Sequence, residues 1–195
     1  VTIAVWTSWA LWLLGYPEQA LTRGLLAVDR SNQLGDPGNQ ILALDFYLYL
    51  CFFNGRTKDI NALLLDFHGM LDKHPTPIHC ADFEFLQGFY SVLKDQVQDG
   101  INQMLRGIKG YQNSGMRCQL SMRKTLLAEV YIINEQWNQA ASLIQEAADL
   151  IEETHERFFQ AETLRVKGML MEKTGRIVEA ENYFLQALRI NPKYK

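Results

Sequence analysis

The sequence lacks an excess of positive charge. Its 195 residues carry 19 Lys and Arg against 22 Asp and Glu, which gives a formal net charge of −3, and the two signs are interspersed along the chain. Binding a nucleic-acid backbone requires clustered Lys and Arg that neutralise phosphates. We therefore expect no nucleic acid among the partners of this segment.

Cysteine is also scarce. Cys51, Cys80 and Cys118 are odd in number and far apart in the sequence. A disulfide framework in a secreted domain uses an even set of cysteines at recognisable spacings. Reduced thiols fit a cytoplasmic protein better, so we expect a cytoplasmic location.

The motifs of common catalytic sites are missing. No Gly-rich phosphate loop with Lys and Ser or Thr is present, and no pair of carboxylates follows a strand pattern. His74, His79 and Cys80 lie close together, but their spacing fits no zinc signature and a fourth ligand is not evident. We expect this segment to be no enzyme and to hold neither a metal nor a cofactor.

No apolar run is long enough to cross a membrane. The most apolar stretch, residues 1–15, is shorter than the roughly 20 residues that span a bilayer, and it lacks the basic leader of a signal peptide. We expect no membrane contact. Because the chain begins with Val1 inside a repeat pattern, we expect it to be a fragment of a longer protein.

What the sequence does contain is a recurring pattern of small and apolar residues. Its best copy covers residues 156–195. There the pattern consists of Leu164, Gly168, Met171, Gly175, Ala180, Phe184, Ala187 and Pro192. Small residues let two antiparallel helices approach closely, and the larger residues fill the seam between them. This pattern resembles a tetratricopeptide (TPR) repeat.

The pattern recurs every forty residues. Gly168 corresponds to Ala128 and Gly88, Ala187 to Ala147 and Gly107, Ala180 to Ala140, Gly100 and Ala20, and Gly175 to Gly55 and Gly15. We predict an all-α, right-handed superhelical solenoid of about five antiparallel helix pairs, as the TPR resemblance implies. The predicted repeats of this single domain are about 1–36, 37–76, 77–116, 117–155 and 156–195.

Each repeat is predicted to contain two helices. The first helices are expected at about 2–14, 39–53, 81–94, 117–134 and 157–173, and the second at about 18–32, 58–72, 97–112, 137–154 and 177–190. Asn191 and Pro192 are expected to end the last helix near the end of the protein. The small residues should be buried where paired helices touch; they are Ala128, Ala140, Ala147, Gly168, Ala180 and Ala187. Gly88, Gly100 and Gly107 should permit close packing in the third pair.

The first helices are expected to line a concave binding surface, as in other repeat arrays. Choosing the face opposite the small residues gives the candidate site Trp9, Trp12, Asp45, Tyr49, Phe52, Phe85, Phe89, Glu129, Arg165 and Glu172. Thr125, Ile132, Glu162 and Met169 are expected on the same face. Such a groove would be aromatic at one end and charged at the other. An equally open alternative is that each aromatic residue belongs to the core between repeats.

Two stretches resemble a more specific group of proteins. Residues 9–21, with the sequence WALWLLGYPEQAL, and residues 150–168, with ERFFQAE followed by RVKG, are similar to segments in the C-terminal repeat region of large bacterial signalling proteins. In those proteins a class III nucleotide cyclase, a protein kinase or a transcription-factor domain precedes a STAND-type ATPase and TPR-like repeats. The resemblance implies a sensory or autoinhibitory solenoid whose catalytic domains lie outside this segment.

Two functions are therefore weighed. The first is a protein–protein or interdomain interaction module, a regulatory scaffold that binds a protein, a peptide or another domain of the same polypeptide in its groove. The alternative is a small-molecule sensor that binds a ligand in the same groove. The apolar first helix, with Trp6, Trp9 and Trp12 on one face, also suggests a homodimer, because such a patch is rarely left bare.

Overall fold

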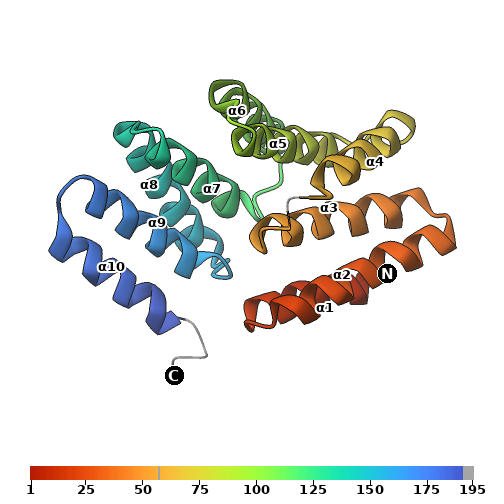
Figure 1. The fold of residues 1–195 in the computed structure, drawn as a ribbon, viewed down its shortest axis with the longest axis horizontal. Helices are drawn as coiled ribbons and strands as arrows, with labels where there is room; N and C mark the ends of the chain where they lie inside the picture. Colours follow the sequence, from red (N-terminus) through yellow and green to blue (C-terminus); the bar gives the residue numbers. More distant parts are fainter. Residues whose placement is uncertain (57, 191–195) are drawn as a thin grey trace. The chain divides into compact units, whose positions relative to one another are not determined.

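The computed structural model describes residues 1–56 and 58–190, and all regular secondary structure in these ranges is α-helical (Figure 1). The ten helices are α1 Thr2–Leu13, α2 Pro17–Leu34, α3 Pro37–Phe53, α4 Ile60–Lys73, α5 Pro77–Leu93, α6 Val97–Asn113, α7 Leu120–Ile133, α8 Trp137–Thr154, α9 Gln160–Lys173 and α10 Ile177–Ile190. They form five consecutive antiparallel pairs, so the predicted all-α fold of helix pairs is confirmed. The predicted helix end at Asn191 and Pro192 lies outside the described residues.

The five turns inside the pairs repeat the same backbone geometry every forty residues. Each turn has a residue with positive φ at its centre; these residues are Gly15, Gly55, Asp95, Glu135 and Gly175, with φ of 78°, 64°, 63°, 58° and 80°. The next residue donates its N–H to a carbonyl five residues earlier, as in Tyr16 to Leu11 (2.9 Å) and Arg176 to Met171 (2.8 Å). This is the hydrogen bond of a Schellman motif, which satisfies the last carbonyls of a helix. The period seen in the sequence is therefore a structural period.

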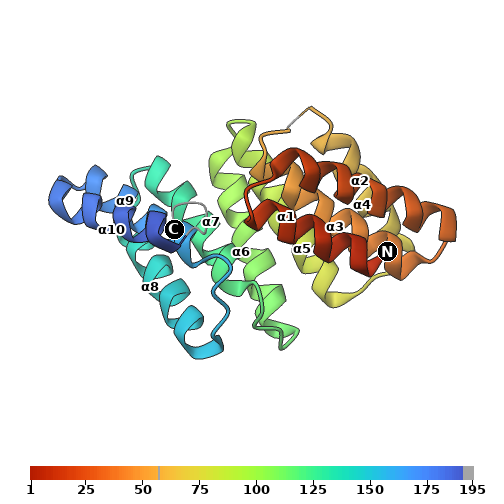
Figure 2. The same ribbon diagram turned by 90° about the horizontal axis from the view of Figure 1, so that it is seen from below.

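Packing divides the chain into two compact units, residues 1–110 and 111–195. In the first unit, α1 packs on α2, α3 on α4, and the first helices α1, α3 and α5 contact one another in turn. In the described part of the second unit, α7 packs on α8 and α9 on α10, while α7 also contacts α9. Figure 2 shows α1 beside α3 and α9 beside α10 from a second direction.

The small residues lie where helices approach most closely. A Cβ atom on Gly88 of α5 would lie 2.6 Å from the carbonyl oxygen of Gly100 of α6, and one on Gly107 would lie 2.6 Å from the backbone nitrogen of Phe85. These distances are too short for any side chain, so the predicted close packing of this pair is confirmed.

Most of the residues predicted to be buried in the seams are buried; they are Ala128, Ala140, Ala147, Gly168 and Ala180. Ala187 is only half-buried, contrary to the prediction. The reason is that α10 packs against α9, whereas α8, which holds the equivalent Ala147, packs against both α7 and α9.

Three helix starts differ from the prediction by three or four residues. α5 begins at Pro77, so His79 and Cys80 lie in a helix and not in a loop; proline is well suited to a first helical position. α7 begins only at Leu120, because Gln119 has a φ of 60° and its N–H donates to the carboxylate of Glu156 at 2.6 Å. α9 begins at Gln160, after the turn at His155.

Candidate functional site

The candidate site is a polar surface on the first helices of the second unit. Its residues are Glu129 and Ile133 of α7 and Glu162, Arg165 and Met169 of α9, and we call it the α7–α9 face. The side chains of Glu129, Glu162 and Arg165 are 26%, 31% and 38% exposed, and Ile133 is 68% exposed. These groups are ordered by contacts within the chain and still reach solvent, as residues that bind a partner must.

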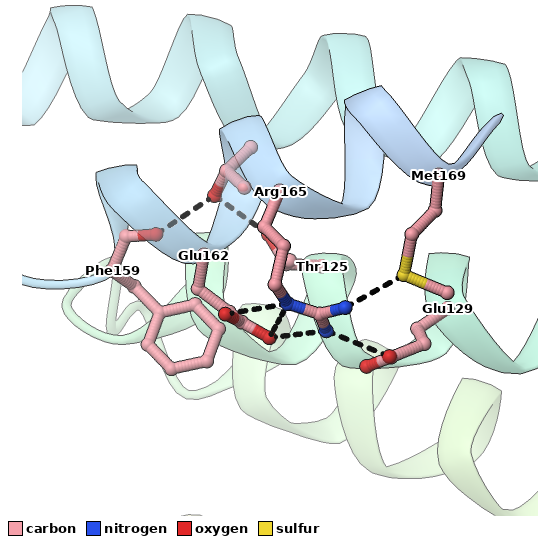
Figure 3. A network of polar contacts seen from close by, with 7 residues as sticks. Thr125, Glu129, Phe159, Glu162, Arg165 and Met169 are labelled. Atoms are coloured by element: carbon pink, nitrogen blue, oxygen red, sulfur yellow. Dashed lines mark hydrogen bonds and ion pairs between the residues drawn. The ribbon is translucent and has the colours of Figure 1, made fainter. Parts of the chain in front are cut away.

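Arg165 is the centre of this face. Its Nε donates to both carboxylate oxygens of Glu162 at 2.9 Å, and its Nη2 donates to Glu129 Oε1 at 2.7 Å. Nη1 contacts the sulfur of Met169 at 2.7 Å, so three sides of the guanidinium have a neighbour (Figure 3). One arginine on α9 therefore fixes the rotamers of groups on both helices.

The electrostatics of this cluster favour a cationic partner. The hydrogen bond to Glu162 is the main cause that raises the pKa of Arg165 above its usual range, with burial opposing it and Glu129 adding to it. Two carboxylates surround one guanidinium, so the cluster has a net charge of −1, and the exposed Glu172 adds another negative charge further along α9. Because Nε and Nη2 of Arg165 are bonded to Glu162 and Glu129, an incoming carboxylate would compete with a resident carboxylate for these two nitrogens.

A buried pair of threonines holds the two helices in register beneath this face. Thr125 Oγ1 of α7 and Thr163 Oγ1 of α9 lie 2.9 Å apart, and both side chains are buried. One hydroxyl donates to the other across the helices, and each oxygen also lies within hydrogen-bonding distance of a nearby carbonyl, Thr125 Oγ1 2.8 Å from that of Ser121 and Thr163 Oγ1 3.1 Å from that of Phe159. The pair thus satisfies its polar atoms in the interior while fixing where Glu129 meets Arg165.

The aromatic residues predicted for the groove lie in the first unit, mostly in its interior. Trp9 is 4% exposed, donates from Nε1 to the carbonyl of Phe46 at 3.3 Å, and packs its ring 5.0 Å from that of Phe46. Tyr49 is 2% exposed and donates to Asp82 at 3.3 Å. Phe85 is fully buried against α6. These side chains fill the space between helices, as the alternative of ordinary core packing expects.

The other predicted site residues divide by accessibility. Asp45 and Phe52 are buried, whereas Trp12 and Phe89 are half-buried and Glu172 is exposed. Trp12 stacks on Phe53 with ring centroids 4.6 Å apart, and Phe89 lies 5.1 Å from Phe52. The structure thus brings Glu129 and Arg165 together with Glu162 and Met169, and it places most of the aromatic candidates in the packing of another unit.

One residue of the α7–α9 face is not among the predicted residues. Ile132 was expected on this face, but it is 1% exposed, and Ile133 takes the outward position. Ile133 is four residues from Glu129, which places both on one side of a helix. Because α7 ends in a continuous run of apolar residues, the sequence pattern does not indicate which of the two isoleucines faces outward.

Comparison with known proteins supports the repeat type. The tetratricopeptide repeat family model matches residues 121–193, which contain α8, α9, α10 and all of α7 except its first residue. A comparison with curated protein sequences found no match.

Two solved structures share the fold. Both are crystal structures of TPR-like repeats from a Podosopora anserina protein described as a kinesin light chain. The first, a variant, has a TM-score of 0.58 at 14% identity, and the match covers 98% of this chain and 94% of the chain in that structure. The second has a TM-score of 0.56 at 14% identity, and the match covers 100% of this chain and 96% of the chain in that structure. Identity this low shows the fold alone. In the described ranges, no helix is long and apolar enough to cross a membrane.

Proposed function

We propose that this chain is an interaction module that binds a protein, a peptide or another domain of its own polypeptide through the α7–α9 face. Repeats of this type generally mediate protein–protein interaction, and they use the surfaces of their stacked helices to do so. The observation that carries the proposal is the accessible cluster of Glu129, Glu162 and Arg165, held by hydrogen bonds across two helices and flanked by the exposed Ile133.

The chemistry of the face indicates which segments it favours. The face has two carboxylates and one guanidinium. A Lys or Arg of the partner is therefore attracted by the net negative charge and need not displace Arg165 from its carboxylates. Ile133 and Met169 offer an apolar contact beside the charges. A basic segment with an apolar anchor residue therefore fits this face better than an acidic segment does.

The biological setting of this module follows from the sequence resemblance. We infer that the chain is a regulatory scaffold in a bacterial multidomain signalling protein of the cytoplasm, in which a cyclase, kinase or transcription-factor domain lies elsewhere in the polypeptide. In that setting the partner of the α7–α9 face is another domain of the same polypeptide, or a separate protein that controls that polypeptide.

A direct test uses two labelled peptides that alternate leucine with lysine or leucine with glutamate. The lysine peptide should bind, and Glu129→Lys or Glu162→Lys should weaken it by at least about tenfold, since like charges then oppose each other. Glu152→Lys, at an exposed position of α8, makes the same charge change as a control. Fluorescence anisotropy measures each affinity. Tighter binding of the glutamate peptide, or equal loss with the control, would contradict the proposal.

We also propose that α1 pairs two copies of the chain. Ile3 is 84% exposed and Trp6 is 53% exposed, on a helix that has no charged side chain. Covering such residues removes apolar surface from water, which favours association. Sedimentation should show dimers that Trp6→Lys dissociates; a wild-type chain that stays monomeric at high concentration excludes this pairing.

A further inference from the structure

A cavity of about 400 Å³ opens in the first unit between α2, α3 and α4. Its apolar lining consists of Leu21, Leu25, Tyr47, Cys51 and Leu63, and its polar lining of Glu18, Thr22, Arg56 and Asp59. The volume falls within the range of small-molecule sites, and an apolar floor with a few polar groups is their usual composition. None of these residues belongs to the α7–α9 face.

A glycine shapes the floor of this cavity. A Cβ atom on Gly24 of α2 would lie 2.8 Å from Cδ2 of Tyr47 and 3.2 Å from Leu50. Only glycine therefore lets the Tyr47 ring lie against the backbone of α2. Leu25, the next residue, is 47% exposed, which leaves an apolar wall open to a ligand.

The charges of the rim are easily rearranged. Arg56 donates from Nη2 to both oxygens of Glu18 at 3.0 and 2.9 Å, but the two side chains are 59% and 76% exposed. An ion pair this exposed contributes at most about 1 kcal/mol. Asp59 precedes the first residue of α4, yet among the described residues its side chain makes no capping hydrogen bond to that helix. Two carboxylates therefore share the rim with one guanidinium.

The floor is uncharged at neutral pH and lies in a negative potential. Burial is the main cause that raises the pKa of Tyr47 to about 12 and that of Cys51 to about 11. The negative charge of Asp59 raises both pKa values further and outweighs the positive charge of Arg56, which lowers them, so the carboxylate of Asp59 acts on the floor of the cavity. The same potential that disfavours a phenolate or a thiolate there favours a positively charged ligand.

We propose that this cavity binds a small amphipathic organic amine. Its apolar group lies against Leu21, Leu25 and Leu63, and its ammonium group lies at the rim between Asp59 and Glu18. A carboxylate in the same place would compete with Glu18 for Arg56 and would be repelled by Asp59. This site is independent of the interaction proposed for the α7–α9 face.

Three probes with one phenyl group test the proposal by isothermal titration calorimetry: phenethylamine, phenethyl alcohol and phenylpropionate. The amine should bind most tightly and the carboxylate most weakly. Asp59→Asn should weaken amine binding by about fivefold, as expected for an exposed charge pair, and Arg56→Gln should tighten it because a competing cation is removed. Glu152→Gln, on α8, is the matched control and should change nothing.

The two rim substitutions have opposite expected signs, which separates charge recognition from unfolding. Both positions are exposed, and an unchanged helical circular dichroism spectrum and melting temperature would show that the variants fold. The proposal is overturned if none of the probes binds, if phenylpropionate binds best and loses affinity with Arg56→Gln, or if Asp59→Asn leaves amine binding unchanged.

Discussion

Arg165 of α9 and Glu129 of α7 are joined by a hydrogen bond of 2.7 Å between the first helices of two neighbouring pairs. The same guanidinium binds Glu162 on its own helix at 2.5 Å. The contact between the two pairs at this surface is therefore polar and partly accessible to solvent, whereas beneath it the helices meet through buried side chains. A partner can reach this connection without opening the core.

The strength of that connection can be measured by a double-mutant cycle. Arg165→Met, Glu129→Gln and the double variant should show a coupling free energy of about 1 kcal/mol, because the pair is only partly exposed and has good geometry. Urea denaturation of the four proteins gives the value. The pair of Arg117 and Glu153, 55% and 60% exposed, is the comparison and should couple more weakly. Equal coupling in the two pairs would show that burial adds nothing at Arg165.

The residue at the centre of each repeated turn predicts which substitutions to glycine stabilise the protein. Asp95 and Glu135 adopt the positive φ that Gly15, Gly55 and Gly175 adopt at equivalent positions. A side chain in this conformation costs roughly 1 kcal/mol relative to glycine, and Asp tolerates it better than most residues. Glu135→Gly should therefore raise the free energy of unfolding by about 1 kcal/mol, and Asp95→Gly by less.

The matched control for these turns is Gly175→Ala, which should lower the stability by about 1 kcal/mol. Thermal denaturation of the three variants gives the order. If Glu135→Gly instead destabilises the protein, its side chain makes a compensating contact at the turn.

Two helical glycines predict opposite effects of the same substitution. Gly88→Ala places a methyl group 2.6 Å from the carbonyl oxygen of Gly100, so the helices α5 and α6 must separate. We expect a loss of about 1–3 kcal/mol. Gly69 of α4 has open space around its Cβ position, so Gly69→Ala should gain up to about 1 kcal/mol from helix propensity. Chemical denaturation compares them; a neutral Gly88→Ala would contradict the close packing.

A buried lysine predicts a dependence of stability on pH. Lys124 is 6% exposed, and its Nζ lies 2.5 Å from Glu146 Oε2. Burial acts to raise the pKa of Glu146, but the hydrogen bond and the charge of Lys124 outweigh it, so the pKa is lowered. A carboxylate whose pKa is lower in the folded state stabilises that state above its unfolded pKa and loses this contribution as the pH falls through the folded pKa.

The measurement for this pair is urea denaturation of wild type and Glu146→Gln between about pH 7 and pH 3. Glu146→Gln should be less stable at neutral pH, and the difference should shrink in acid. Because the Glu146 side chain is 47% exposed, the effect should be modest. A difference that grows on acidification would mean that the pKa is raised and not lowered.

The sequence by itself determined the helices, their pairing and the period of forty. This information is local: apolar spacing, turn glycines such as Gly15 and Gly175, and the small residues Gly88 and Gly100 act within one pair. It also indicated that Glu129 and Arg165 belong to first helices. Each of these features depends on residues close in sequence or one repeat apart, which is why a single sequence reveals them.

Only the tertiary structure decided which side of each first helix is covered. The apolar residues of α3 lie all around the helix, so its sequence has no single outward side, and contacts with α1, α2, α4 and α5 bury Tyr49 and Asp45 alike. The start of α7 likewise depends on Glu156, which is thirty-seven residues away from Gln119. Burial depends on neighbours from several helix pairs at once, and a periodic sequence pattern does not specify those neighbours.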